Sequence, residues 1–571
     1  MKHTSTFLFA ALLGSGQALA QGNASKKAGA DISQFTSVEP STQPQTLRIP
    51  STHTFQMLVQ AGTPYSQAAN GLLKENFDFT AYVPMYSGKS DGKGNSAFGQ
   101  DHNAKGYLSI NHEGSSTATS GVSMLNLDFN PAAQRWDVTA KNAVDFSPVV
   151  GTFNNCSGGI TPWRTIVTCE ENTPTSPTDS NGDGYLDFGW TVEIDPATHS
   201  VKDQNGDGTP DKLWRMGRIR HENIVVAPDQ RTVYEGADDG SSNSFVYKYV
   251  SDQAGKLANG SLYVLKLNGK IGTATTGTWL PVPNNTPAEC SNTTALARAL
   301  GATSFNGVED IDISPLTHQI YFTAKGPGTI YRFTDSGQKG TTVSNFEVFA
   351  GNSPTNPSQS YTINYGSGVV SELWRTGNDN LTFDSKGNLY VLQDGGRNHV
   401  WLIRPSHTPA TPAVELFAVT PAGSEPTGMT FSPDEQFMFI SIQHPSALNT
   451  EATVDAAGQE VVFNKSTALV IARKEALGKA NKEKASEQVG AAVYPNPVSG
   501  SEINLHITHP RQEAATLQVM NRVGKPVLEQ SIELVQGVND LKIPVSKLRS
   551  EQYYLVIKTA TTTITRSFIK Q

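Results

Sequence analysis

Short apolar runs separated by polar turns recur along most of the chain. In each copy an aromatic or aliphatic residue leads into a polar turn, often with proline, and then into a β-rich run. The six copies begin at Phe129, Ile194, Ala227, Ile313, Phe383 and Phe431. Hairpins too small to bury their own apolar face stack around the axis of a β-propeller. The pattern predicts an all-β fold, a β-propeller with insertions, over residues 21–472. Unrelated hairpins in a β-sandwich are the alternative, because turn chemistry alone does not choose between all-β folds.

The pattern changes near residue 473. Residues 473–490 are rich in Lys, Glu and Ala and contain almost no large apolar residue, which predicts a linker. Residues 491–571 contain alternating runs at 517–520 and 553–557. Such alternation is typical of a small antiparallel β-sandwich, and we expect one at the C-terminus.

The first 20 residues have the pattern of an export signal. Lys2 is followed by an apolar run over 7–13 and then by Ala18-Leu19-Ala20, the small-x-small pattern that signal peptidase requires. We expect residues 1–20 to be a signal peptide rather than a buried N-terminal helix, because the run is too short to span a bilayer and ends in a cleavage pattern. The protein would then be exported through the periplasm.

Charge and composition narrow the range of partners. The chain has 44 Lys+Arg and 52 Asp+Glu, for a net charge of −8, which argues against nucleic acid as the main partner. Hydrophobic residues make up 37 %, and we expect no integral membrane segment. Cys156, Cys169 and Cys290 would enter an oxidising compartment, where an odd number leaves one thiol without an intramolecular bridge. That thiol is either buried and inert or used in chemistry.

Two acidic loops have nearly the same spacing of oxygen ligands. The first contains Asp179, Asn181, Asp183 and Asp187, and the second contains Asp203, Asn205, Asp207 and Asp211. Oxygens spaced in this way, with a glycine at the sharp turn, wrap a hard divalent ion, so the loops predict calcium. The place of the bidentate glutamate of an EF-hand is taken by Trp190 and Trp214, so a further oxygen must come from elsewhere. An ordinary Asx-rich turn is the alternative reading of each loop.

Other acidic residues lie near the ends of the predicted strands. They are Glu113, Glu170, Glu171, Glu222, Glu235, Asp238, Asp239, Glu309, Asp310 and Glu425. The strands of a propeller radiate from one axis, so such residues can converge on one mouth of the channel. Converging carboxylates cannot all ionise unless cations neutralise them, and a metal cluster would do so. Taken singly, each of these residues is more often a solvated surface group.

Several longer sequence motifs occur in the same order as in PhoX-type alkaline phosphatases. The chain resembles this family over about residues 50–472. The motifs are Asn111-His112-Glu113, Asn155 to Trp163, Thr168-Cys169-Glu170-Glu171-Asn172, Gly217-Arg218 before Glu222, Asp238-Asp239 before 247–249, 260–264 and Gln443-His444-Pro445.

The resemblance implies a propeller that holds a cluster of Ca²⁺ and Fe³⁺ and hydrolyses small phosphate monoesters. By position, the cluster cysteine is Cys169, which would leave Cys156 and Cys290 free to bridge. The acidic ligands that it implies are Glu113, Glu170, Glu171, Glu222, Asp239, Glu309 and Glu425. No serine nucleophile is required.

The chain departs from the family pattern at one position. Many members carry an arginine two residues before the glutamate equivalent to Glu309, and this chain has Gly307 there. Arg164, Arg218, Arg298 or another basic group would have to supply the charge that holds the phosphate. Otherwise turnover is weakened or the substrate differs. The alternatives are a calcium-binding propeller that acts as a binding protein and a phosphodiesterase on the same cluster.

The C-terminal module resembles the sorting domain of the type IX secretion system. The likeness rests on the opening Tyr494-Pro495-Asn496-Pro497, the turn at Gly524-Lys525 and the terminal strand at 565–570. It implies that residues 491–571 are an address for the type IX secretion machinery and that the protein is secreted or attached to the cell surface.

Overall fold

The computed structural model describes residues 31–85, 105–175, 178–478, 490–509, 512–535, 537–559 and 563–571. The predicted signal peptide, residues 1–20, lies outside the described residues, as do positions 479–489 of the predicted linker. Within the described ranges no helix has the length and apolar character needed to cross a bilayer.

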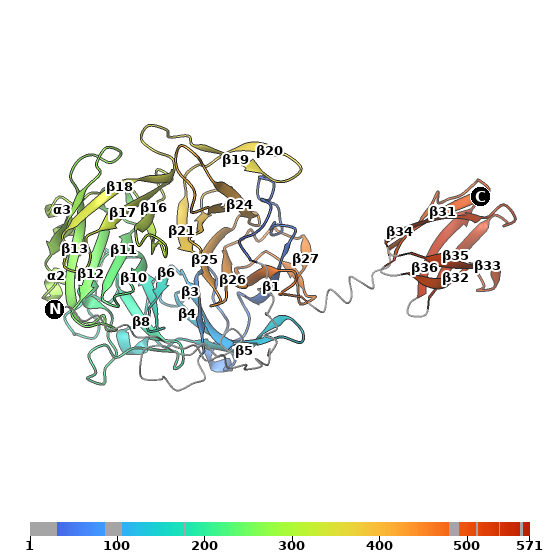
Figure 1. Ribbon diagram of the computed structural model, residues 1–571. Coiled ribbons are helices and arrows are strands. Elements are labelled where there is room, and N and C mark those ends of the chain that lie inside the picture. Colours follow the sequence, from blue (N-terminus) through green and yellow to red (C-terminus); the bar gives the residue numbers. More distant parts are fainter. Residues whose placement is uncertain are drawn as a thin grey trace, which may run out of the picture.

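Six antiparallel blades make up most of the described chain (Figure 1). Blade 1 contains β2 (Phe77–Pro84), β3 (Lys105–His112), β4 (Gly121–Asn130) and β5 (Arg135–Ala143). Blade 2 contains β6 (Asn155–Ile160), β7 (Ile166–Glu170), β8 (Thr191–Asp195) and β9 (Ser200–Val201). Blade 3 contains β10 (His221–Val226), β11 (Thr232–Ala237), β12 (Val246–Ser251) and β13 (Gly260–Leu267), with β14 (Gly277–Val282) at its outer edge.

The other three blades follow the same plan. Blade 4 contains β15 (Val308–Ile313), β16 (Ile320–Ala324), β17 (Thr329–Asp335) and β18 (Thr342–Gly351), and β18 pairs with β14 of blade 3. Blade 5 contains β21 (Asn378–Phe383), β22 (Leu389–Gln393), β23 (His399–Ile403) and β24 (Val414–Val419). Blade 6 contains β25 (Glu425–Phe431), β26 (Phe437–Gln443), β29 (Thr467–Arg473) and, from the other end of the chain, β1 (His53–Gln60).

The six blades close into a ring. The innermost strands pack in the order β2, β6, β10, β15, β21 and β25, and β25 packs against β2. The first strand, β1, pairs with β29 of the last blade and so joins the two ends of the propeller, as the blue and orange strands in Figure 1 show. The β-propeller prediction is therefore confirmed, and each of the six turn phrases falls in a different blade.

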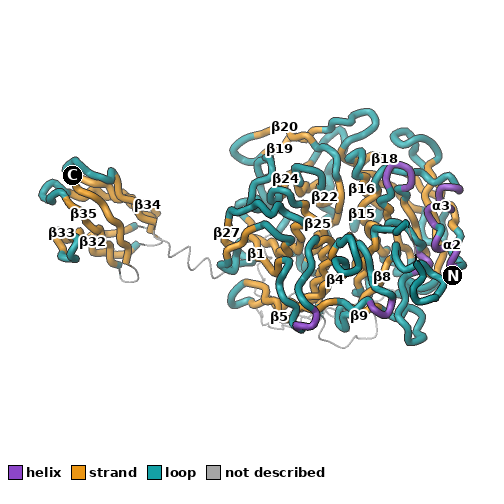
Figure 2. Tube along the Cα trace, turned by 180° about the vertical axis from the view of Figure 1, so that it is seen from behind, coloured by secondary structure: helices purple, strands orange, loops and turns teal. Residues whose placement is uncertain are grey.

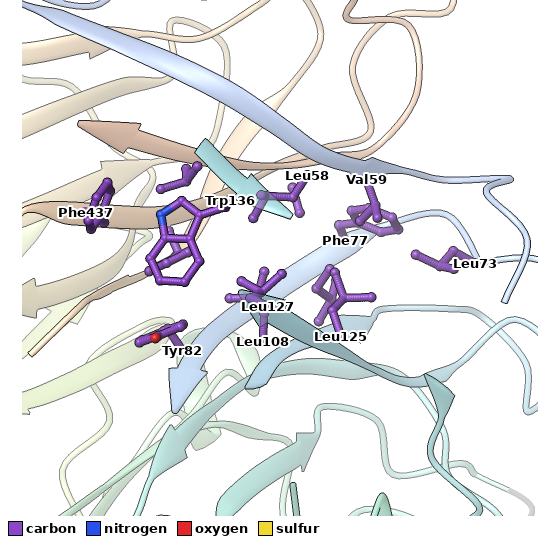
Figure 3. Close-up of a cluster of buried hydrophobic side chains, with 14 of the residues drawn as sticks. Leu58, Val59, Leu73, Phe77, Tyr82, Leu108, Leu125, Leu127, Trp136 and Phe437 are labelled. Carbon is purple, nitrogen blue, oxygen red and sulfur yellow. The ribbon is translucent and has the colours of Figure 1, made fainter. Parts of the chain in front are cut away.

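An apolar core fills each interface between neighbouring blades. Between blades 6 and 1, the fully buried Trp136 packs edge-on against Phe437, with their ring centroids 5.2 Å apart (Figure 3). Full burial of one large apolar side chain contributes roughly 1.5–3 kcal/mol. The alternation of apolar residues in each strand thus stabilises the contact between blades rather than a single central core.

Close to the axis the backbones approach too tightly for side chains at some positions. A Cβ at Gly159 of β6 would lie 2.3 Å from the carbonyl oxygen of Ile224 in β10. A Cβ at Gly428 of β25, where φ is +48°, would lie 2.1 Å from the backbone nitrogen of Thr80 in β2. Glycine at these positions lets the inner strands meet.

Helices and extra hairpins lie outside the six blades (Figure 2). The helices are α1 (Gly240–Asn243), α2 (Pro287–Ser291) and α3 (Thr293–Ala299), and the 3₁₀ turns are Ala68–Asn70, Ser147–Val149 and Trp214–Met216. The hairpins are β19 (Ser360–Asn364) with β20 (Val369–Leu373) and β27 (Ala452–Val454) with β28 (Glu460–Val462). The propeller packing continues past the predicted linker start at 473, because Leu477 is buried against blades 6 and 1.

The C-terminal module is a β-sandwich. One sheet contains β30 (Gly490–Tyr494), β31 (Glu502–His509) and β34 (Gly537–Pro544). The other contains β33 (Pro526–Leu534), β32 (Glu513–Asn521), β35 (Glu551–Lys558) and β36 (Thr563–Lys570). Ile503, Leu517 and Leu555 are among the buried residues of its core. Its alternating apolar positions therefore face inward, as the sequence pattern predicts.

Candidate metal centre

A β-bulge recurs in the innermost strand of every blade. The strand register shifts between Phe77 and Thr80, between Asn155 and Gly158, between His221 and Ile224, between Val308 and Ile311, between Asn378 and Leu381, and between Thr427 and Thr430. In each bulge two residues oppose one residue of the second strand, and such bulges re-aim side chains. The first bulged residues are Asp78, Cys156, Glu222, Glu309, Asp379 and Gly428. Five of the six blades thus present an acidic residue or a thiol at the same level of the ring.

A second set of polar residues follows the second strand of each blade. These residues are Glu113, Glu171, Asp238, Lys325, Asp394 and His444, each directly after β3, β7, β11, β16, β22 or β26. They stand at the same end of the blades as the bulges, because the ladder of each blade pairs the bulge end of its inner strand with the final residues of the second strand. The two sets together line one end of the ring, and we call this end the acidic mouth.

The second residue of several bulges ties neighbouring blades together. The Asn223 side chain exchanges two hydrogen bonds with the backbone of Ile311 in the next blade. Asp310 accepts hydrogen bonds from the Leu381 backbone N–H and the Ser157 hydroxyl. Asp310 is therefore held between the blades, whereas its neighbour Glu309 is presented at the mouth.

Two groups of ligand atoms lie close enough to share a cation. The Cys156 Sγ and carboxylate oxygens of Glu171 and Glu222 lie within 4.8 Å of one another, and so do carboxylate oxygens of Glu222, Glu309 and Asp379. Glu222 belongs to both groups, so the two candidate positions are adjacent. The first group offers a soft sulfur and two oxygens, which suits a transition metal, and the second offers only oxygens, which suits a hard divalent cation.

Burial and mutual repulsion raise the pKa of several carboxyls at the mouth. Burial raises the pKa of Glu222 and of Glu309 well above the ordinary value, and neighbouring carboxylates raise them further. Burial and the nearby Glu113 raise the pKa of Glu171 to about 8. Oε1 of Glu309 is buried and has no hydrogen-bond partner among the described residues. A buried carboxylate oxygen without a donor is costly unless a cation binds it, so the residues present fit a metal cluster.

Neighbouring side chains orient two of these carboxylates. The Asn154 amide donates to Oε1 of Glu113 at 3.1 Å, and the Gln443 amide donates to Oε2 at 2.7 Å. Arg220 donates to Oε1 of Glu171 at 3.2 Å and also to its backbone oxygen. These contacts hold Glu113 and Glu171 in place before any ligand binds.

Lys325 is the only lysine that forms ion pairs with these acidic residues in the described part of the chain. Its Nζ lies 2.6 Å from Oδ2 of Asp379, 3.3 Å from Oδ2 of Asp394 and 3.8 Å from Oε1 of Glu309. A third of the Lys325 side chain is exposed.

Five of the acidic ligands expected from the sequence lie at the mouth. They are Glu113, Glu171, Glu222, Glu309 and Glu425. The carboxyl of Glu425 lies beside Asp394, and its Oε2 is 3.4 Å from Nε2 of the neighbouring His444.

Glu170 and Asp239 are placed differently. The Glu170 carboxylate is fully engaged by Lys212 at 2.7 Å, by Thr152 and by three backbone N–H groups of residues 153, 189 and 190. Asp239 lies at the start of α1, and its neighbour Asp238 is the residue whose Oδ1 comes within 3.5 Å of the Cβ position of Gly307. Glu170 therefore stabilises the loop before β8 by accepting hydrogen bonds from its backbone.

The locations of the cysteine thiols differ from those that the family resemblance implied. Cys169 is fully buried in the core between blades 2 and 3, directly opposite the bulge that presents Cys156. All three thiols are free, so the expected bridge between Cys156 and Cys290 is absent from the described residues. The Cys290 thiol donates instead to the carbonyl oxygen of Asn284.

None of the three candidate arginines points a free guanidinium into the mouth. Arg164 lies in the turn between β6 and β7, at the opposite end of that hairpin from Cys156. Arg218 donates to the backbone oxygen of Phe188, and Arg298 donates to the Asn243 side chain. Arg220, two residues before Glu222, contacts a mouth carboxylate, that of Glu171.

The two acidic loops lie outside the mouth and are packed together. Asp179 accepts hydrogen bonds from the backbone N–H groups of Gly182 and Gly184, and Asp203 does the same with Gly206 and Gly208. Trp190 and Trp214, which follow the loops, contact each other with centroids 4.9 Å apart. The aromatic contact explains the tryptophans at these positions.

Sequence reasoning missed Asp78, Cys156, Asp379, Asp394 and Lys325 as residues of the mouth. A usable signal was present, because an acidic residue or cysteine stands near the start of the first apolar run of five blades. The register shift that directs this residue to the mouth depends on the partner strand, so the local sequence does not reveal it.

The chain is similar to known proteins in sequence and in structure. Residues 117–446 match the family model described as alkaline phosphatase PhoX, and residues 492–571 match the secretion system C-terminal sorting domain. The structure of Pseudomonas fluorescens PhoX in complex with vanadate, a transition state analogue, is 20% identical, with a TM-score of 0.57 over 77% of this chain and 98% of that chain. A periplasmic gluconolactonase of Pseudomonas aeruginosa is 12% identical, with a TM-score of 0.31 over 86% of this chain and 99% of that chain. No curated protein matches the chain.

Proposed function

The chain belongs to the family of PhoX alkaline phosphatases, and from this premise we propose that it is a secreted, metal-dependent phosphatase that hydrolyses phosphate monoesters. The observation that carries the proposal is the acidic mouth, where buried carboxylates and one thiol meet and Oε1 of Glu309 has no donor. Such a group is costly unless its carboxyls are protonated or cations bind to them, and bound cations can act on an anionic ester.

We assign the two ligand groups to different metals. Cys156, Glu171 and Glu222 would hold iron, because a thiolate is a suitable iron ligand. Glu222, Glu309 and Asp379 would hold calcium, which prefers carboxylate oxygens. When bound, these metals supply Lewis acidity and neutralise charge on the phosphoryl group. Glu113 and Glu425 complete the acidic wall around them.

The protein residues of the mouth position the substrate and the ligands. We assign phosphate binding to Arg220, whose side chain is about a third exposed and lies beside Glu171. A guanidinium can bind a phosphoryl group through two parallel hydrogen bonds. Gly307 has no side chain and cannot bind phosphate in this way. Asn154 and Gln443 keep Glu113 oriented while substrate enters.

The acidic loops have a separate proposed role. Asp179, Asn181, Asp183 and Asp187 of one loop, and Asp203, Asn205, Asp207 and Asp211 of the other, would bind calcium and stabilise the insertion in blade 2. The C-terminal sorting domain supports export, and we propose that it addresses the protein to the type IX secretion machinery after passage through the periplasm.

An assay on the purified protein tests the proposal. A chromogenic phosphate monoester should be hydrolysed, a chromogenic diester should be hydrolysed much more slowly, and a chelator should abolish both activities. Preferred hydrolysis of the diester would favour a phosphodiesterase on the same centre. Binding of calcium without any hydrolysis would favour a binding propeller, the alternative suggested by glycine at position 307.

A further inference from the structure

Lys325 stands at a position that is acidic in four other blades. The residue after the second strand is Glu113 in blade 1, Glu171 in blade 2, Asp238 in blade 3 and Asp394 in blade 5. Blade 4 has Lys325 instead. Blade 6 has His444. Blade 4 therefore contributes a lysine to a ring in which four of the six equivalent positions are acidic.

The Lys325 ammonium contacts carboxylates as a bound cation would. It donates to Asp379 at 2.6 Å and lies 3.3 Å from Asp394, while Oε1 of Glu309 is 3.8 Å away and has no hydrogen-bond partner among the described residues. Three carboxylates therefore lie around this one ammonium. Asp379 is also part of the oxygen-only ligand group.

The backbone fixes this lysine in place. Its N–H donates to the carbonyl oxygen of Gly307 at 2.8 Å, and its own carbonyl accepts from Gly377 at 3.0 Å. A Cβ at Gly307 would lie 3.3 Å from the Lys325 Cβ and 3.5 Å from Asp238, so the absence of a side chain there makes room for the lysine. The backbone of Lys325 is therefore held by two neighbouring segments, at Gly307 and at Gly377.

We propose that the Lys325 ammonium occupies the place of one divalent cation between Asp379 and Asp394, so that replacing it with a neutral residue creates a new cation site. The inference rests on the proposed function, because it treats the acidic mouth as a place for cations. An ammonium offers one charge and three donors at fixed positions, whereas a divalent cation gathers more oxygens. The native chain therefore holds one divalent cation fewer than its carboxylates could bind.

The test counts cations on the full-length protein. Wild type, Lys325→Met, Lys325→Gln and Lys325→Arg are stripped with a chelator and titrated with Ca²⁺, and bound calcium per chain is measured by calorimetry and elemental analysis. Lys339→Met, at an exposed lysine, is the matched control. We expect Lys325→Met and Lys325→Gln to bind one more calcium ion per chain than wild type, and Lys325→Arg and Lys339→Met to bind the wild-type number.

The difference between variants decides the inference, whatever the activity of the wild type. An equal number of calcium ions in wild type and both neutral variants would overturn it, even if the wild type is an active metal-loaded phosphatase. A gained site in the neutral variants of an inactive wild type would uphold it while the proposed function fails. Failure of both neutral variants to fold in calcium would also overturn it, because a cation at that place should restore the missing charge.

Discussion

Glu309 is the residue at which the need for a cation is most direct. Its carboxylate is buried, one oxygen has no hydrogen-bond partner among the described residues, and Lys325 is too distant to donate to it. We expect Glu309→Gln to lower kcat/KM for a phosphate monoester by roughly 100-fold or more, since a neutral amide is a poor ligand for a hard cation. Bound calcium, measured by elemental analysis, should fall with it. Glu451→Gln, at an exposed position, should change neither quantity.

The two cysteines of blade 2 make a matched pair. Both belong to the apolar core between blades 2 and 3, but of the two only Cys156 places its Sγ within 4.8 Å of carboxylate oxygens of Glu171 and Glu222 among the described residues. We expect Cys156→Ser to lose iron, measured by elemental analysis. Cys169→Ser should keep its iron but melt at a lower temperature, because an unpaired buried hydroxyl costs about 1–3 kcal/mol. The reverse pattern would assign the iron to Cys169, as the family resemblance implied.

At the scale of the element, the bulges that aim the ligands depend on close contact between inner strands. Gly428 holds the bulge position of blade 6 at a φ of +48°, and an added Cβ would lie 2.1 Å from the Thr80 nitrogen. We expect Gly428→Ala to lower the free energy of unfolding in urea by roughly 1–3 kcal/mol from overpacking alone. Gly71→Ala, at a positive φ with nothing within 4 Å, is the control and should cost clearly less. Equal losses would mean that backbone conformation, not contact with blade 1, is what glycine supplies.

The hairpins could be predicted from the sequence, whereas the bulges could not. The turns at Pro315 and Pro433 are local signals, because the residues that make each turn are neighbours in the chain. A bulge is defined by the partner strand, so the sequence around Cys156 and Cys169 does not say which thiol points to the axis. For the same reason Glu113 and Glu222 could be found by family likeness, whereas Asp379 and Lys325 could not, because strand register inside blades 5 and 4 and packing between those blades bring them together.

At the scale of the whole molecule, closure of the ring brings negative charge from every blade to one end. The net charge of −8 gives no hint of this, because the mouth gathers carboxylates that are far apart in the sequence. The propeller is also joined by β1, which comes from the start of the described chain and pairs with β29 near residue 473. The packing between blades therefore has to hold together a mouth whose carboxylates repel one another.

That repulsion predicts how the stability of the metal-free protein depends on pH. The pKa of Glu171 rises from an ordinary value of 4.5 to about 8 in the folded protein, through burial and the nearby Glu113. Between these values the folded state binds more protons than the unfolded state, so the free energy of unfolding falls as the pH rises through this range. We expect chelator-treated protein to melt at a lower temperature at pH 8 than at pH 6, and calcium to raise the melting temperature more at pH 8, because a bound cation replaces the lost protons. The Glu171→Gln variant should show a weaker dependence on pH, and a melting temperature that rises with pH in the chelator would contradict the assignment of the acidic mouth as the origin of the effect.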